Sequence, residues 1–362
     1  MELSLASQFA MTKSLPLLRI WWIDDETDRL SLSAQKAIER PDHPRLRGKR
    51  AAKLVVIKVG ERKRVAEVLT ELDEACRRSE APHLIVIDQM LNLPNDDGVV
   101  QRGSGFAAAM RDKHPTIPLV GVTGASASEI AALQKEQFIE FFERDSLQSG
   151  DRIPDLYGIA DGFAGVLKAR PKGKTSAVTN LLKLLDCPTE DRALLVECLP
   201  GPFKAPWDEG TPHAFARWVW HNLTGRAGFL YDDLEGATLV GLKREGFQLL
   251  SARLKECEYL GAFSSASRLR WWVSKVRQKV RELTRAESTE PLNSLGRKLI
   301  GDKKELFSKC YGNAEAEAVP DVVAFADGTQ RKRVQTRVGD TKPLETDTAP
   351  LGFEQRRVFF GR

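Results

Sequence analysis

The feature that most constrains the fold of this chain is a short apolar segment that ends in an acid, from His83 to Asp88. Four consecutive aliphatic residues, Leu84 to Ile87, are typical of a strand that is buried on both faces, as in a parallel sheet. Open α/β sheets bind their ligands outside the carboxyl ends of such strands. We therefore expect Asp88 to lie at a ligand-binding edge of a parallel sheet.

Two further segments repeat this pattern of an apolar strand followed by polar residues. Residues 18–23 lead directly into Asp24 and Asp25, and residues 118–122 lead into Thr123. Because the carboxyl ends of parallel strands meet at one edge of a sheet, these side chains are expected near Asp88.

Strands and helices alternate along the first half of the chain. Residues 53–59 and 138–142 supply two more apolar strands, and the amphipathic segment 61–78 is one of the helices expected between strands. This alternation predicts an α/β fold with a doubly wound, five-stranded parallel sheet.

Taken together, residues 17–170 resemble the receiver domain of two-component response regulators. That family carries an acidic pair after its first strand, a phospho-accepting aspartate after its third, and Thr or Ser after its fourth. These places are held here by Asp24, Asp25, Asp88 and Thr123. A lysine follows the family's fifth strand, whereas Arg144 stands at that position here. Gly105 is similar to the glycine that opens the family's third helix.

The resemblance implies a phosphorylation site and a metal. Asp88, Thr123 and Arg144 would act on the phosphoryl group, and Asp24, Asp25 and Asp88 would hold Mg²⁺, which prefers oxygen ligands. The implied partner is a histidine kinase or a phosphotransfer protein. Arginine keeps the charge of the family's lysine, but its guanidinium is longer and planar.

Two interpretations of this half remain open. The intact acids favour a response regulator that accepts phosphate at Asp88. The replaced lysine and the long loop over residues 89–103 favour a pseudo-receiver, an adaptor that docks a kinase or a multiprotein assembly without phosphorylation. In neither case do we expect enzyme activity beyond receiver-type self-phosphorylation.

Composition shifts divide the chain further. A segment rich in Pro, Gly, Ser and Lys follows the first half and is typical of a linker, and Asp327-Gly328 between two apolar runs predicts a β-hairpin. We expect a leader at 1–16, a receiver-like domain at 17–168, a linker at 169–176, a helical output domain at 177–318 and a hairpin-containing tail at 319–362.

The best-defined helix of the second half is predicted over residues 267–285. Its apolar residues fall on one arc at helical spacing, basic residues flank that arc, and Trp271 projects opposite to it. The candidate partner-binding residues are Arg270, Trp271, Arg277 and Arg281. Such a surface suits the phosphates of a nucleic acid or a protein groove.

Charge and cysteine usage limit the remaining choices. Residues 1–150 carry 21 basic and 22 acidic side chains, and the remainder carries 34 and 28, so only the second part is basic, with a net charge of +6. Because this excess is modest, we favour a protein partner over nucleic acid. Five scattered cysteines without metal-ligand spacing and the absence of a long apolar run predict a cytoplasmic protein that does not enter a membrane.

Overall fold

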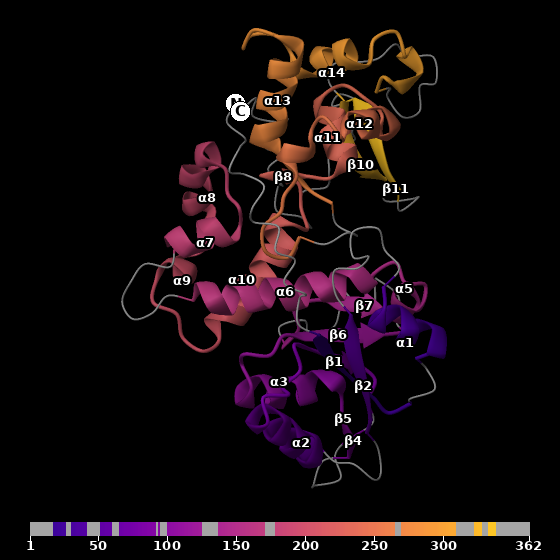
Figure 1. The fold of residues 1–362 in the computed structure, drawn as a ribbon, viewed down its shortest axis with the longest axis vertical. Helices are drawn as coiled ribbons and strands as arrows, with labels where there is room; N and C mark the ends of the chain where they lie inside the picture. The colour runs from indigo at the N-terminus through magenta and orange to yellow at the C-terminus, as the bar shows by residue number, and fades with distance from the viewer. Residues whose placement is uncertain are drawn as a thin grey trace, which may run out of the picture. The chain divides into compact units, whose positions relative to one another are not determined.

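A computed structural model of the 362-residue chain divides it into two compact units, Met1–Ala164 and Gly165–Arg362 (Figure 1). The structure describes residues 17–26, 30–41, 51–59, 65–91, 93–94, 100–124, 137–170, 178–264, 269–308, 322–327 and 332–337. The predicted leader and the segment 171–177, within and beside the predicted linker, lie outside these ranges. No helix within them is both long and apolar enough to cross a membrane.

The first unit is built on a five-stranded parallel sheet. Its strands are β1 (Leu18–Asp24), β2 (Ala52–Lys58), β3 (Leu84–Asp88), β6 (Leu119–Thr123) and β7 (Phe141–Glu143). They are ordered β2-β1-β3-β6-β7, which is a doubly wound order with the chain reversing direction across the sheet beside β1 and β3. The predicted α/β fold is confirmed.

Helices cover both faces of this sheet (Figure 1). They are α1 (Leu32–Glu39), α2 (Val65–Arg77), α3 (Gly103–Lys113), α5 (Arg144–Gln148) and α6 (Ile153–Ala169). The apolar stripe of α2, which includes Val68 and Leu72, packs with α3 against Ile85 and Ile87 of β3. On α6, the Tyr157 hydroxyl donates a hydrogen bond of 2.6 Å to the carbonyl of Ile38 at the end of α1.

Between β3 and α3 the long predicted loop contains a two-stranded ladder of β4 (Leu93–Pro94) and β5 (Val100–Gln101). The helix after it begins at Gly103, two residues before the glycine that we expected to open it. A Cβ atom at Gly103 would lie 2.1 Å from the carbonyl oxygen of Asp88. Only glycine lets the chain pass this close to the end of β3.

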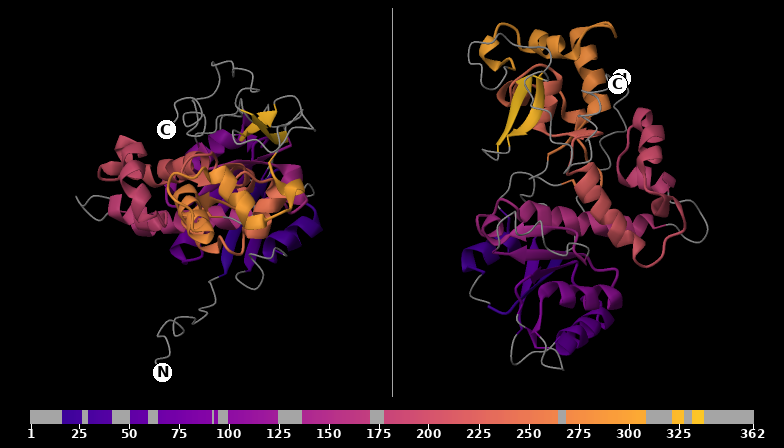
Figure 2. Two further views of the ribbon diagram at one scale, coloured as in Figure 1. Left: turned by 90° about the horizontal axis from the view of Figure 1, so that it is seen from above. Right: turned by 180° about the vertical axis from the view of Figure 1, so that it is seen from behind.

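The second unit is mainly helical, as predicted. Its elements are α7 (Val178–Leu184), η4 (Thr189–Asp191), α8 (Arg192–Cys198), α9 (Gly201–Lys204), α10 (Thr211–Trp218), η5 (Val219–Leu223), β8 (Leu230–Tyr231), α11 (Asp233–Leu239), α12 (Arg244–Leu250), η6 (Lys255–Cys257), β9 (Trp271–Trp272), α13 (Val273–Thr284), α14 (Leu292–Ile300), η7 (Lys304–Leu306), β10 (Val322–Asp327) and β11 (Lys332–Arg337). Strands β10 and β11 pair antiparallel and confirm the predicted hairpin. Strand β10 of this hairpin lies beside α11. The hairpin is drawn in yellow in Figure 2.

The predicted helix over residues 267–285 is wrong at its start. Helix α13 begins at Val273, and the two preceding residues, Trp271 and Trp272, form β9, which pairs antiparallel with β8. Pairing with a segment about forty residues earlier in the chain therefore overrides the helical periodicity of this stretch. As a consequence, Trp271 is only 2% exposed and does not project into solvent.

Candidate functional site

The strand register brings the predicted acids to one edge of the sheet. Ile23 lies opposite Ile87, so Asp24 and Asp88 follow at neighbouring positions on adjacent strands. Asp88 in turn lies opposite Val122, which places Thr123 one step further along the next strand. Asp24, Asp88 and Thr123 are all buried, and Asp25 is half-buried.

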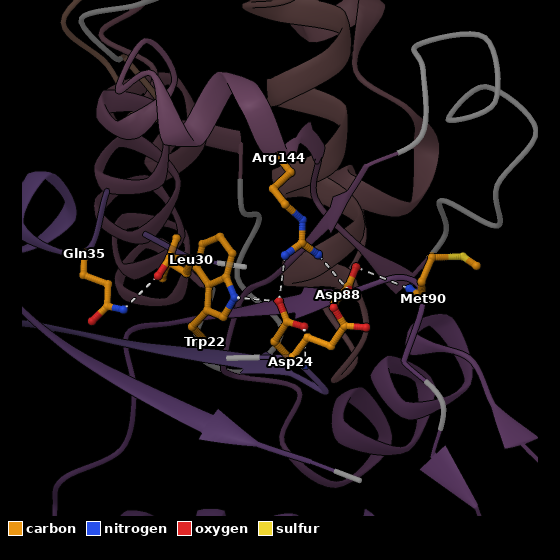
Figure 3. Close-up of polar contacts among 8 residues, drawn as sticks. Trp22, Asp24, Leu30, Gln35, Asp88, Met90 and Arg144 are labelled. Atoms are coloured by element: carbon orange, nitrogen blue, oxygen red, sulfur yellow. Dashed lines mark hydrogen bonds and ion pairs between the residues drawn. The ribbon is translucent and has the colours of Figure 1, made fainter. Parts of the chain in front are cut away.

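Arg144 closes this edge from the side of β7. Its Nη1 donates to Asp24 Oδ2 at 3.0 Å, and its Nη2 lies 2.9 Å from Asp88 Oδ2 (Figure 3). The second contact is an ion pair at close range but not a well-aligned hydrogen bond. A single guanidinium therefore joins the carboxylates of two different strands.

Both carboxylates have further donors. Asp24 Oδ1 accepts from the backbone N–H of Glu26 at 3.0 Å, and its Oδ2 also accepts from Trp22 Nε1 at 3.3 Å. Asp88 Oδ1 accepts from the backbone N–H of Met90 at 3.3 Å. These contacts fix the carboxylates in place, as Figure 3 shows.

The environment of Asp88 opposes its ionisation. Burial raises the pKa of the Asp88 carboxyl above its usual value, and the neighbouring Asp24 charge raises it further. The Arg144 charge and the Met90 N–H act in the opposite direction but do not cancel the rise in this pKa. The net effect is a pKa of the Asp88 carboxyl above its usual value, with burial as the main cause.

The acid group has the composition of a magnesium site. Asp24, Asp25 and Asp88 each offer one carboxylate oxygen, and these oxygens lie within 4.8 Å of one another. Magnesium takes a few carboxylate ligands and keeps several waters, so this donor set fits the ion. The guanidinium of Arg144 already pairs with two of the three acids.

In the second unit, several basic side chains of the segment 267–285, where we predicted a partner-binding helix, pair with acids or carbonyls of the same unit. Arg270 Nη1 lies 3.4 Å from Glu235 and 3.6 Å from Asp232, and Lys279 Nζ lies 2.5 Å from Glu256. Arg281 donates to the carbonyl of Glu287 at 2.5 Å. The exposed arginine surface that we predicted for Arg270 is therefore wrong, while Arg277 and Arg281 are half-buried.

Trp271 also departs from its predicted role. Its Nε1 donates to Asp233 Oδ1 at 2.8 Å, and its ring meets Phe247 edge-on at 5.6 Å. Because the indole is enclosed in the core, it cannot stack on a base or enter a partner's groove while this unit stays folded. The prediction that the Trp271 indole is exposed is wrong.

A different surface of the same unit is exposed, and the sequence reasoning missed it. Helices α11 and α12 are joined by four residues that include Gly241, whose φ is +77°. A Cβ atom at Gly236 would lie 2.7 Å from the Phe247 ring, so the two helices pack in close contact. Two short helices with a glycine in the turn between them have the element order of a helix-turn-helix.

The exposed side of α12 and of the turn after it is mixed. Its polar and charged members are Arg244, Glu245, Gln248 and Arg253, and its apolar members are Leu249 and Ala252. After α12, Glu258 forms an antiparallel bridge with Trp271, which also pairs with Tyr231 of β8. A glycine between two apolar runs, Gly241, is the signal from which this close pair of helices could have been found.

Comparison with solved structures finds response regulators and receiver domains. No protein-family model matches this chain, and no curated protein matches it. It is similar to the RcsB response regulator of Salmonella typhimurium, at 14% identity over 51% of this chain and 80% of that chain, with a TM-score of 0.29. It is also similar to the receiver domain of NtrX from Brucella abortus, at 20% identity, over 37% and 96%, with a TM-score of 0.25.

A further similar structure is the response regulator TrrA of Thermotoga maritima in complex with Mg²⁺ and BeF, at 16% identity, over 35% and 86%, with a TM-score of 0.24. At these values the comparisons carry no conclusion about this chain. The strand order and register described above carry the assignment by themselves: the first unit resembles a receiver domain, as predicted.

Proposed function

We propose that this protein is a response regulator of a phosphorelay that accepts a phosphoryl group at Asp88 and signals through its second unit. The observation that carries the proposal is the convergence of Asp24, Asp25 and Asp88 at the carboxyl edge of the sheet, with Thr123 beside them. Two of these acids are buried, and burying a carboxylate costs free energy that a bound cation can help to offset.

In this proposal an Asp88 oxygen attacks the phosphorus of a phosphohistidine on a histidine kinase or a phosphotransfer protein. The P–N bond breaks, and the departing imidazole keeps the electron pair and takes up a proton. The chain's task is to hold the nucleophile in line and to neutralise charge on the phosphoryl oxygens. Thr123 would donate to one of those oxygens and Arg144 would face another.

Asp24, Asp25 and Asp88 would hold Mg²⁺, which when bound supplies positive charge to the phosphoryl oxygens. The alternative function, a pseudo-receiver that docks a kinase or an assembly without phosphorylation, is favoured by one observation. Arg144 pairs with both Asp24 and Asp88. Its positive charge is therefore already engaged, whereas phosphorylation of Asp88 requires that charge to face a phosphoryl oxygen.

Intact mass after incubation with acetyl phosphate and Mg²⁺ separates these two functions. A response regulator should gain one phosphoryl group, and Asp88→Asn should gain none. Asp112→Asn, which changes an exposed acid on α3, is the matched control and should behave like the wild type. A wild type that stays unmodified under conditions in which a known receiver is labelled would favour the adaptor.

For the second unit, we propose that α12 docks in the major groove of duplex DNA. In helix-turn-helix proteins the second helix reads base edges, and Arg and Gln are the side chains that pair bidentately with guanine and adenine. Arg244 lies at the first position of α12, with Gln248 one turn later and Arg253 just beyond its end, all three exposed. This replaces the surface of α13 that the sequence suggested.

Retention of a mixed-sequence duplex across a salt series tests this surface. Combined Arg244→Gln and Arg253→Gln should weaken binding and reduce the salt slope by about one unit per lost phosphate contact. The matched control is Arg277→Gln with Arg281→Gln, which should leave both quantities nearly unchanged. If both variants lose the same amount of DNA binding, or if the α12 substitutions leave DNA retention unchanged, the result would instead favour a protein partner for this unit.

A further inference from the structure

Arg144 is held firmly in its position. It is the first residue of α5 and follows β7 without an intervening loop, and Leu147 of the same helix is fully buried. The hydroxyl of Ser146 donates to the carbonyl of Glu143 at 2.7 Å and fixes the junction of strand and helix. The Arg144 side chain itself is only 9% exposed, so its guanidinium stays within the pocket.

The guanidinium meets the acids in a way that a lysine cannot. Its two terminal nitrogens reach different carboxylates, Nη1 to Asp24 at 3.0 Å and Nη2 to Asp88 at 2.9 Å. An ammonium group is a single compact charge, whereas the planar fork presents donors in two directions at once. Both contacted oxygens are Oδ2 atoms, and both carboxylates belong to the group of acids that would hold a metal.

We propose that Arg144 is a built-in counter-cation of the acid pocket, which competes with Mg²⁺ for Asp24 and Asp88. One positive charge already pairs with two of the pocket's three acids, so part of their negative charge is compensated without a divalent ion. For magnesium to take its ligands from these carboxylates, the guanidinium has to release at least one of them. Magnesium affinity is therefore set by the strength of the arginine fork as well as by the acids.

This inference rests on the proposed function only in taking the acid pocket as the place where the cation binds. It makes a claim that phosphorylation does not test. Wild-type protein should bind Mg²⁺ weakly, and removal of the fork should tighten binding even where no phosphate is present.

The experiment is a calorimetric Mg²⁺ titration of the full chain at constant ionic strength. Arg144→Met, which keeps an apolar stem of similar length, should bind Mg²⁺ at least about tenfold more tightly than the wild type, equal to about 1.4 kcal/mol. Arg144→Lys should fall between them, since lysine keeps the positive charge but lacks the planar fork that holds both carboxylates. Arg78→Met is the control: Arg78 is an exposed partner of Glu80 in the same unit, and its loss changes the net charge equally.

Thermal unfolding supplies an independent readout. Saturating Mg²⁺ should raise the melting temperature of Arg144→Met and Arg144→Lys more than that of the wild type, because a ligand stabilises the state that binds it. If Arg144→Met does not fold, Arg144→Lys alone decides by the same comparison. Equal or weaker Mg²⁺ binding in the variants, or no binding by any of the proteins, would overturn the inference.

The two proposals fail separately. Tighter Mg²⁺ binding by Arg144→Met in a protein that acetyl phosphate never labels would keep the counter-cation and remove the phosphorelay. If Asp88 is phosphorylated but substitution of Arg144 leaves the Mg²⁺ affinity unchanged, the phosphorelay is kept and the counter-cation is removed.

Discussion

The indole of Trp271 is surrounded by the second unit's core. The backbone of Trp271 pairs with that of Tyr231. The indole Nε1 donates to Asp233, and the indole ring meets the ring of Phe247 edge-on. Burying an indole removes a large apolar surface from water, and its N–H then needs a partner in the protein. The residue therefore stabilises the unit where three chain segments meet, instead of reading a ligand.

Trp271→Ala should lower the free energy of unfolding by about 3–5 kcal/mol, the usual effect of truncating a buried aromatic side chain. Leu260→Ala, at a side chain that is 67% exposed, is the matched control and should change it by less than about 0.5 kcal/mol. Urea unfolding of both variants gives the comparison. A Trp271 variant as stable as the control would contradict the burial of the indole.

Asp191 makes the stability of the second unit depend on pH. Burial raises the pKa of its carboxyl, while the hydroxyl of Ser274, which donates to Asp191 Oδ2 at 2.5 Å, acts to lower it. A carboxyl whose pKa is raised on folding contributes stability that is fully present below its unfolded pKa, near 3.8, and is lost as the pH rises through the folded pKa.

We expect Asp191→Asn, relative to the wild type, to gain stability as the pH rises from about 3.5 to about 7, because asparagine has no charge to desolvate. Ser274→Ala should enlarge the wild-type loss, since it removes a hydrogen bond that favours the ionised form. Urea unfolding at several pH values measures both effects. A difference between Asp191→Asn and wild type that stays constant with pH would contradict this account.

At the scale of elements, the turn between α11 and α12 sets how the exposed helix is presented. Helix α11 begins with a capping box, in which the Asp232 side chain accepts from the Glu235 N–H and the Glu235 side chain accepts from the Asp232 N–H. The turn after it combines a left-handed Gly241 with close packing, since a Cβ atom there would lie 2.1 Å from the carbonyl oxygen of Asn293 on α14. Conformation and space both require glycine.

Gly241→Ala should therefore destabilise the protein by several kcal/mol, beyond the roughly 1–2 kcal/mol of a left-handed backbone alone, and should weaken DNA retention with it. Gly301→Ala is the matched control: φ is also positive there, at +64°, but no atom lies within 4 Å of the added Cβ. Similar losses of stability in the two variants would show that α14 can move away from the turn.

At the scale of the whole molecule, each unit has a hydrophobic core of its own. Leu72 of α2 is fully buried in the core of the first unit, and Leu254, just after α12, is fully buried in the core of the second. Units with separate cores are expected to unfold as separate cooperative steps.

Scanning calorimetry should show two transitions. Leu72→Ala should lower one of them and Leu254→Ala the other, each by the shift that a loss of about 2–5 kcal/mol produces. Each substitution serves as the control for the other, since both truncate a fully buried leucine. A single transition that both substitutions lower equally would contradict independent folding of the units.

The sequence by itself determined the sheet and most of its edge. The apolar runs that end at Asp24, Asp88 and Thr123 are local signals, and the register of parallel strands follows from them, so these residues meet where they were expected. The Mg²⁺ site of Asp24, Asp25 and Asp88 and the phosphorylation of Asp88 stay predictions, although the acids do lie together.

Only the tertiary structure decided what surrounds those acids and which surface the second unit exposes. The bridge from Arg144 to Asp24 and Asp88 depends on three strands that are far apart in sequence, and no local pattern records it. The pairing of α11 with α12 was not predicted, because it depends on how the two helices pack, with Gly236 against Phe247, and not on the period of either helix. Trp271 was misplaced because its strand pairing with residues 230–231 contributes more than the helical period around it.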